Sequence, residues 1–380
     1  MSKLPDATPG DQVSILGRPL HFSFWPMRKG SRRYGLQSNL FAVDPWTIIR
    51  DRIRTQCPVS ARPEATACVE QASDFFKSSQ ASEITAARPL QIYYCFMNLA
   101  KALVLSKGGV PNFDQASHGL SEKLAPGGKE LKDAYLEAFP SPGRFGKPQV
   151  FSELYKLIVG QNVAGGTQYN LSALMPQILP GHRLWSRAAN KQERFIAINE
   201  IRFMQDPSNQ LWLNVLVIED DLSRLAITHK QFLEESQLFP SFHEVKCSES
   251  VDGHRRLLCF EQSVKSRFGA RPSDQVQSLV DPFKRRIWVT INGAQPYRRY
   301  YAYLAPSTEQ NALLPQLLSI YAIAYYLGSI TRYRPQLFDT LLADSFGPRI
   351  EEFVSVQPLQ FVYMVASEFA EQEITRPALI

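Results

Sequence analysis

The pattern of hydrophobic and polar positions predicts helices in the first half of the chain. Asp44 can cap a helix with Pro45 in its first turn, and this helix is expected to end before Pro58. The segment from Pro89 to Lys107 is apolar on nearly all sides, which is typical of a buried helix. Apolar residues at helical spacing predict further helices from Pro63 through Phe76, over Lys129–Phe139 and over Phe151–Gly160.

The centre of the chain is rich in strand-forming residues. Leu211–Ile218 is apolar on both faces, which is typical of a central strand covered on both sides. Arg286–Ile291 and Arg299–Leu304 flank Asn292-Gly293 and are expected to form a hairpin. Three further strands are predicted, over Phe195–Met204, Phe242–Lys246 and Arg256–Phe260.

Helices are predicted again towards the C-terminal end, over Gln310–Ile330, Leu337–Leu342 and Leu359–Gln372. Because helices and strands are segregated along the chain, the fold class is α+β. We expect the helical N- and C-terminal regions to pack together, with a strand-rich region between them in sequence. The expected organisation is an irregular segment over residues 1–43, a helical region over 44–190, a strand-rich region over 191–305 and a C-terminal helical region over 306–380.

Composition is that of a folded globular protein. The 380 residues are 44% hydrophobic and 11% aromatic, which excludes disorder for most of the chain. Lysine and arginine number 42 against 36 acidic residues, and the net charge of +6 permits a nucleic-acid partner without requiring one. The two longest apolar runs fall short of the ~20 residues that a membrane span needs, so no membrane association is expected.

The five cysteines form no metal-binding or disulfide pattern. Their number is odd and no two have CxxC spacing, which favours a reducing compartment. The first residues lack the apolar stretch of a secretory signal, so we expect a cytoplasmic protein. The sequence also lacks P-loop, GxGxxG, GxSxG and HExxH motifs. We therefore expect no metal and no cofactor.

Four polar residues interrupt the apolar helix at spacings of three, four and three, so they lie along one face: Gln91, Tyr94, Asn98 and Lys101. Buried hydrogen-bonding groups need partners. One interpretation is a solvent-facing stripe with Lys101 reaching water. A second is the polar floor of a ligand pocket with Lys101 contacting an anion, and a third is an interface between subunits. His118, in the loop that follows, is a candidate hydrogen-bonding or catalytic group.

Two further basic clusters are candidate binding residues. Arg332 and Arg334 flank Tyr333 after an apolar helix, and they can grip phosphate or, alternatively, satisfy helix carbonyls and internal acids. Basic side chains near aromatic ones in and around the predicted hairpin could bind single-stranded nucleic acid, although they could equally protect a sheet edge. These candidates are Lys284, Arg285, Arg286, Arg298 and Arg299.

Three segments resemble YaaC-like proteins, a bacterial family without an assigned activity. The first is YYCFMNLAKALVLSKGG…SHGLSEKL, from Tyr93 to Leu124. The other two are GSITRYRPQLFDTLL, Gly328 to Leu342, and PLQFVYMVASEF, Pro358 to Phe369. In layout the resemblance covers most of residues 44–375, and it is specific in these three segments.

The segment that ends at His118 is also similar to HEPN domains, through Ala100–Leu103, Lys107-Gly108 and Pro111. That resemblance implies RNA binding, RNA cleavage or phage defence. Ribonucleases of that family use an arginine followed a few residues later by a histidine. No arginine stands at that distance before His118, and the one match, Arg224 with His229, lies in the strand-rich centre. The resemblance therefore supports helical packing more than it supports cleavage.

Three hypotheses follow. The first is a protein that binds RNA or a nucleotide-type anion, within a bacterial defence or regulatory assembly, through Asn98, Lys101, His118, Arg332 and Arg334. The second is a metal-independent HEPN-like ribonuclease in which His118 is the acid–base group. The third is a structural subunit whose apolar helices contact a protein partner or a second copy of the chain.

Overall fold

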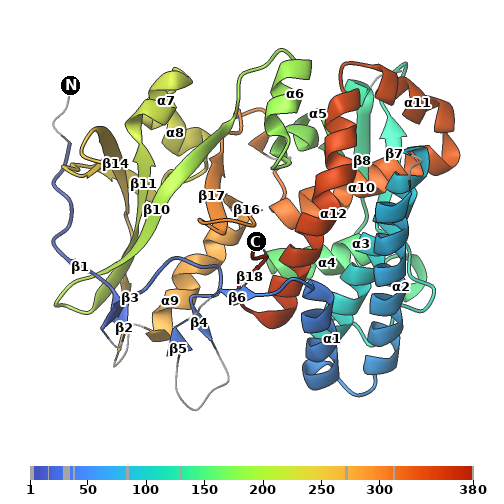
Figure 1. The fold of residues 1–380 in the computed structure, drawn as a ribbon, viewed down its shortest axis with the longest axis horizontal. Helices are drawn as coiled ribbons and strands as arrows, with labels where there is room; N and C mark the ends of the chain where they lie inside the picture. The colour runs from blue at the N-terminus through green and yellow to red at the C-terminus, as the bar shows by residue number, and fades with distance from the viewer. Residues whose placement is uncertain are drawn as a thin grey trace. The chain divides into compact units, whose positions relative to one another are not determined.

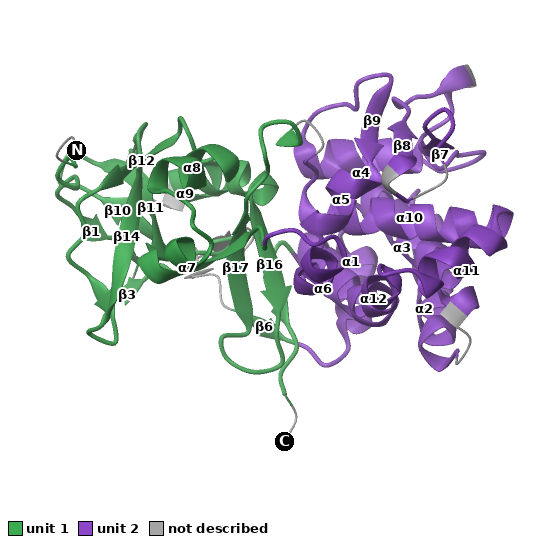
Figure 2. Cartoon of the chain, turned by 90° about the horizontal axis from the view of Figure 1, so that it is seen from above, with its two compact units in different colours: residues 1–41, 193–310, 371–380 green, residues 42–192, 311–370 purple. Residues whose placement is uncertain are grey.

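The computed structural model describes residues 4–15, 17–28, 35–36, 39–82, 85–128, 131–269, 273–310 and 313–378. The chain forms two compact units (Figure 2). Unit 1 contains Met1–Phe41, Glu193–Gln310 and Glu371–Ile380, and unit 2 contains Ala42–Gln192 and Asn311–Ala370. The fold is α+β, with antiparallel sheets. None of the described helices combines the length and apolar character that crossing a membrane requires.

Unit 2 is mainly helical (Figure 1). Its first helix begins as predicted, because the Asp44 carboxylate accepts a hydrogen bond of 3.0 Å from the backbone N–H of Trp46. Its helices are α1 (Pro45–Gln56), α2 (Arg62–Ala81), α3 (Arg88–Ser106), α4 (Val150–Val159), α5 (Leu171–Leu174), α6 (His182–Ala188), α10 (Gln316–Tyr333), α11 (Pro335–Ala343) and α12 (Gly347–Ala370), with short 3-10 turns at Thr85–Ala87, Leu131–Asp133, Arg144–Gly146 and Met175–Gln177.

The buried helix α3 is the centre of unit 2. It packs against α2, α4, α10 and α12. The rings of Phe96 and Phe361 stack with centroids 3.8 Å apart, and this contact joins α3 to α12. Gly328 of α10 lies so close to α3 that an added Cβ would stand 2.9 Å from the Cβ of Tyr93. The N- and C-terminal helices therefore pack together, as the sequence predicted.

The predicted helix over Lys129–Phe139 is wrong where the structure describes it; Lys129 itself lies outside the described residues. Ala134–Ala138 is strand β8, paired with β7 (Leu120–Leu124) and β9 (Thr167–Asn170) in an antiparallel sheet. Alternate residues of β8 are buried, so the decisive period is two residues rather than 3.6.

Two C-terminal helix starts also differ from the prediction. Helix α10 starts at Gln316 rather than Gln310, directly after Pro315. Helix α12 starts at Gly347 and continues through Pro358, so proline does not mark its beginning. Packing of the helix against its neighbours outweighs the backbone hydrogen bond that proline removes.

Unit 1 is built on an antiparallel sheet in the order β12-β14-β11-β10-β17-β16. The central position of β11 confirms the prediction for that strand, and its residues from Leu211 to Val217 are buried. The predicted hairpin is also confirmed, with Thr290 opposite Arg299. The strands are β10 (Phe195–Gln205), β11 (Gln210–Ile218), β12 (Phe242–Val245), β14 (Arg255–Gln262), β16 (Ile287–Ile291) and β17 (Arg298–Tyr303), with two-residue strands β13 (Ser250–Val251) and β15 (Ser266–Arg267) beside them.

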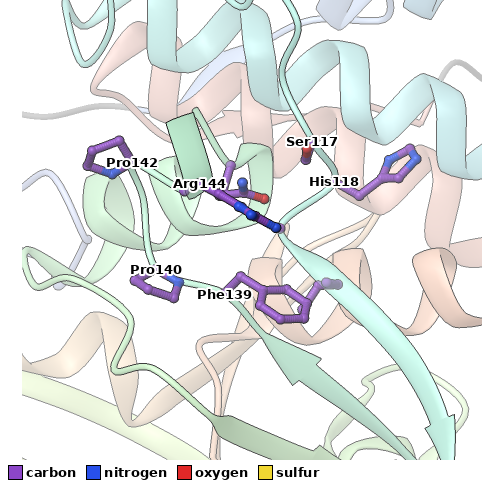
Figure 3. A pocket seen from close by; sticks show the side chains of 10 residues that line it. Ser117, His118, Phe139, Pro140, Pro142 and Arg144 are labelled. Carbon is purple, nitrogen blue, oxygen red and sulfur yellow. The ribbon is translucent and has the colours of Figure 1, made fainter. Parts of the chain in front are cut away.

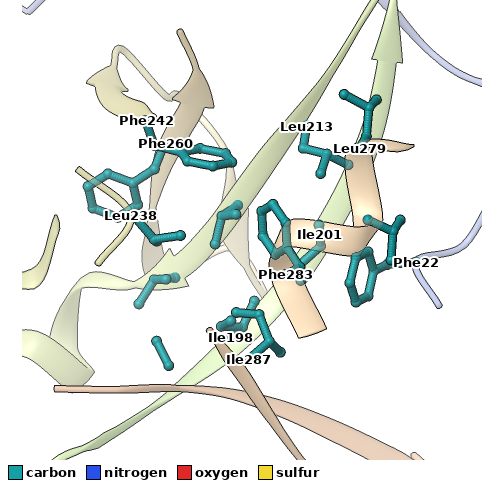
Figure 4. Close-up of a cluster of buried hydrophobic side chains, with 14 of the residues drawn as sticks. Phe22, Ile198, Ile201, Leu213, Leu238, Phe242, Phe260, Leu279, Phe283 and Ile287 are labelled. Carbon is teal, nitrogen blue, oxygen red and sulfur yellow. The ribbon is translucent and has the colours of Figure 1, made fainter. Parts of the chain in front are cut away.

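Helices and N-terminal strands cover and extend this sheet. Phe22, Ile201, Leu213 and Phe283 belong to one buried cluster (Figure 4). The helices of unit 1 are α7 (Glu219–Arg224), α8 (His229–Glu235) and α9 (Ser273–Val280), followed by a 3-10 turn at Asp281–Arg285. The N-terminal strands are β1 (Asp11–Gln12), β2 (Ser14–Ile15), β3 (Arg18–Pro19), β4 (Met27–Arg28), β5 (Gly35–Leu36) and β6 (Leu40–Phe41), which pairs in parallel with β18 (Ile374–Thr375).

Candidate functional site

The polar stripe of α3 faces helix α2. The side-chain amide of Gln91 donates a 2.9 Å hydrogen bond to Ser78, and that of Asn98 donates a 2.8 Å bond to Gln71. Between these bonds, the Tyr94 ring stacks on Phe75 with centroids 5.3 Å apart. Most of the stripe is therefore a seam between two helices. The sequence carries a sign of this, because Gln71, Phe75 and Ser78 repeat the spacing of the stripe.

Arg332 reaches this stripe from the end of α10. Its Nη1 donates a hydrogen bond of 3.1 Å to the hydroxyl of Tyr94. Arg332 itself is exposed, and Tyr94 is half-buried. The fold thus brings two sequence-predicted residues together although 238 positions separate them.

His118 lies next to the same helices. Its Nδ1 is 2.5 Å from the hydroxyl oxygen of Tyr93, and its ring centroid is 5.8 Å from that of Tyr325. Burial lowers the pKa of His118, and the positive charges of Lys101 and Arg332 lower it further. Sequence reasoning missed the two tyrosines, which were interpreted only as apolar helix positions.

Lys101 and Arg332 are cations with no carboxylate partner in the described part of the chain. Lys101 is half-buried, and its Nζ is 6.0 Å from the centroid of the Phe113 ring. Neither residue forms an ion pair with any part of the chain that the structure describes. The fold therefore places two cations, neither of which has an acidic partner among the described residues, near a histidine whose pKa is lowered.

Comparison with protein families identifies the chain. A family model described as YaaC-like Protein matches residues 46–369. The chain belongs to the YaaC-like family. Searches of the curated proteins and of the solved structures found no match. The residues matched in this YaaC-like protein include α3, His118 and Arg332.

Arg334 of the YaaC-like protein has a different environment from Arg332. Its guanidinium forms an ion pair with Glu122 on β7, and the Glu122 side chain is 6% exposed. This pairing agrees with the alternative that the sequence left open, in which an internal acid satisfies the arginine. Because a buried carboxylate already compensates its charge, Arg334 is poorly suited to hold a phosphate.

The basic residues around the hairpin of unit 1 are dispersed. Arg298 is buried, and its Nη2 donates a 2.8 Å hydrogen bond to the backbone oxygen of Ile374. Arg299 is exposed and points to the opposite face of the strand. Lys284, Arg285 and Arg286 lie outside the paired strands. The Nζ of Lys284 is 4.7 Å from the centroid of the Trp25 ring. Arg285 is exposed, and Arg286 is half-buried beside Ser241.

The arginine–histidine spacing match of unit 1 does not form one site. His229 Nδ1 is 2.9 Å from a Glu244 oxygen, whereas Arg224 pairs with Glu193 at 3.4 Å. Among the described ranges, no group of three or more histidine, cysteine, aspartate or glutamate side chains is arranged to hold a metal ion. All five cysteines carry free thiols.

Proposed function

We propose that the face formed by Tyr94, Lys101, His118 and Arg332 binds the phosphate groups of RNA or of a nucleotide. The observation that carries the proposal is the Arg332–Tyr94 hydrogen bond of 3.1 Å, which holds an exposed guanidinium beside α3. Arginine and lysine side chains without carboxylate partners are suited to bind phosphate oxygens.

His118 contributes a hydrogen bond in this proposal. Burial raises the pKa of Tyr93, so its hydroxyl keeps its proton and can donate to Nδ1 of His118. The neutral imidazole then carries its proton on Nε2, where it can donate to a ligand oxygen. The stacked rings of Phe75 and Tyr94 provide an aromatic surface beside the cations, of the kind on which bases stack.

The double variant Lys101→Ala/Arg332→Ala tests the proposal. We expect weaker binding of single-stranded RNA and a shallower dependence of log Kd on log salt, by about 1.4, since each phosphate contact contributes about 0.7. The control is Arg54→Ala/Lys77→Ala, which removes two exposed cations elsewhere in unit 2. Equal affinities and salt slopes in wild type and in both double variants would refute the assignment.

We infer a metal-independent, HEPN-like ribonuclease as the second candidate function. It is favoured because Arg332 is hydrogen-bonded to Tyr94 while His118 is hydrogen-bonded to the adjacent Tyr93, and because the charge of Arg332 contributes to the lowered pKa of His118. A neutral histidine can remove the proton of a ribose 2′-hydroxyl, and an arginine can stabilise the phosphorane. Labelled RNA incubated in EDTA with wild type, His118→Ala and Arg332→Ala tests this candidate. Cleavage by wild type alone supports it, and equal cleavage by all three contradicts it.

A further inference from the structure

Unit 2 contains a pocket of about 520 Å³ beside the Ser117–Leu120 segment (Figure 3). This volume lies within the range of small-molecule sites, about 300–1,000 Å³. One part of its wall is apolar and includes Phe139 and Pro140, while Ser117, Arg144 and Gln149 contribute polar groups. His118 also lines this pocket, and in Figure 3 its ring points away from Arg144.

Gln149 is the most informative residue of this pocket. It is only 8% exposed, and its hydrogen bonds to described residues involve its backbone and not its side-chain amide. Its backbone is held firmly, because its N–H donates to Ser141 and its carbonyl accepts from the N–H of Glu153. Because Gln149 lines the pocket, this amide is available to form hydrogen bonds with a ligand there.

Gly143 provides room for this amide. A Cβ added at residue 143 would stand 2.1 Å from Nε2 of Gln149, closer than any real contact. Any larger residue at position 143 would therefore displace the amide from its present place.

We propose that this pocket binds a mononucleotide, with the base against Phe139 and Gln149 and the phosphate towards Arg144. A glutamine amide offers an NH2 group that donates and a carbonyl oxygen that accepts, which matches the edge of a nucleobase. The ring of Phe139 offers a stacking surface, and a guanidinium suits a phosphate. The inference rests on the proposed function for its ligand class, but it places the ligand in a pocket whose lining shares only His118 with the proposed phosphate-binding face.

Titration calorimetry of the full chain with AMP, GMP, CMP and UMP tests the proposal. We expect at least one of them to bind, and its affinity to fall about tenfold or more in Gln149→Leu and in Arg144→Ala. Gly143→Ala should also weaken binding, because it moves the amide. The matching nucleoside should bind more weakly than the nucleotide to wild type, and Arg144→Ala should remove that difference. Thermal unfolding checks that each variant is folded.

The Lys101→Ala/Arg332→Ala protein separates the two assignments. If the pocket binds the nucleotide, this double variant keeps wild-type nucleotide affinity even when it has lost RNA binding. If the nucleotide affinity instead falls in the double variant and persists in Gln149→Leu, the pocket assignment is wrong and the proposed function stands. The pocket assignment is also wrong if none of the four nucleotides binds, or if the pocket variants keep the wild-type affinity.

Discussion

His118 illustrates how single residues acquire their properties from neighbours that are distant in sequence. It accepts or shares a hydrogen bond with Tyr93, and it lies near the charges of Lys101 and Arg332. Arg349 is a second example, because it is a fully buried arginine whose Nε and Nη1 lack hydrogen-bond partners among the described residues. Burial lowers the pKa of Arg349 to about 10, and nearby Glu352 opposes this change.

The pKa of His118 should rise when either nearby positive charge is removed. NMR titration of the imidazole in Lys101→Ala and in Arg332→Ala is expected to give a higher pKa than in wild type. In each variant only burial and the one remaining cation still lower the pKa. An unchanged pKa in both variants would show that these charges do not act on His118. Arg54→Ala provides the control, since its side chain is 78% exposed and paired with Asp51.

The same environment predicts how stability depends on pH. The folded-state pKa of His118 is lowered, so the unfolded chain binds a proton first as the pH falls. This contribution to stability is present above a pH of about 6.5 and is lost as the pH falls towards the folded-state value. Urea unfolding should show that the free energy of unfolding falls more between pH 7.5 and pH 5.5 in wild type than in His118→Asn. A larger loss in the variant would contradict this sign.

Arg349→Met is expected to stabilise the protein. Among the described residues the guanidinium makes one long hydrogen bond, 3.4 Å to the backbone oxygen of Ile178, which compensates little of its desolvation. An apolar side chain of similar length should raise the free energy of unfolding in urea by about 1 kcal/mol or more. Arg349→Ala should lower it, because a cavity remains. If both variants are destabilised equally, the guanidinium contributes more than its visible contacts explain.

At the scale of elements, helix pairs decide which residues come together. The seam between α2 and α3 satisfies Gln91 and Asn98 without a ligand, which neither helix alone reveals. Helix α10 places Arg332 beside Tyr94, and its close approach to α3 depends on Gly328. The spacing of α3 and α10 therefore controls the geometry of the proposed phosphate site.

Gly328→Ala should destabilise the protein although alanine favours helices. Helix propensity alone predicts a gain of about 1 kcal/mol. The new Cβ, however, would stand 2.9 Å from the Cβ of Tyr93, and we expect a net loss of about 1–3 kcal/mol in the free energy of unfolding. Gly165→Ala is the control, since an added Cβ there meets nothing within 4 Å. A net gain in Gly328→Ala would show that the helices separate without cost.

The whole molecule consists of two units, each with its own buried core. Unit 1 is assembled from three separate stretches of the chain, and unit 2 from two. Phe203 belongs to the core of unit 1, and Phe96 is fully buried in unit 2. Units with separate cores are expected to respond separately to a local change.

Phe96→Ala should destabilise unit 2 selectively. Removing this ring is expected to cost about 3–5 kcal/mol. Hydrogen exchange followed by mass spectrometry should show faster exchange in residues 42–192 and 311–370, with little change in 193–310. Phe203→Ala should give the reverse pattern. Equal loss of protection in both units would show that the chain unfolds as one cooperative body.

The sequence by itself determined the α+β class, most helix and strand positions and the hairpin, because these depend on local periodicity, caps and turn residues. It failed at β8, where five residues are too few to separate a period of two from one of 3.6. It identified Lys101, His118 and Arg332 individually as polar residues in unusual surroundings.

Only the tertiary structure decided which of these residues meet. It gave Arg334 a carboxylate in Glu122, left Arg332 exposed beside Tyr94, and turned most of the polar stripe towards α2. The physical reason is that charge compensation and hydrogen bonding depend on distances in space. Local patterns set which faces are apolar, but the packing of α2, α3 and α10 sets those distances.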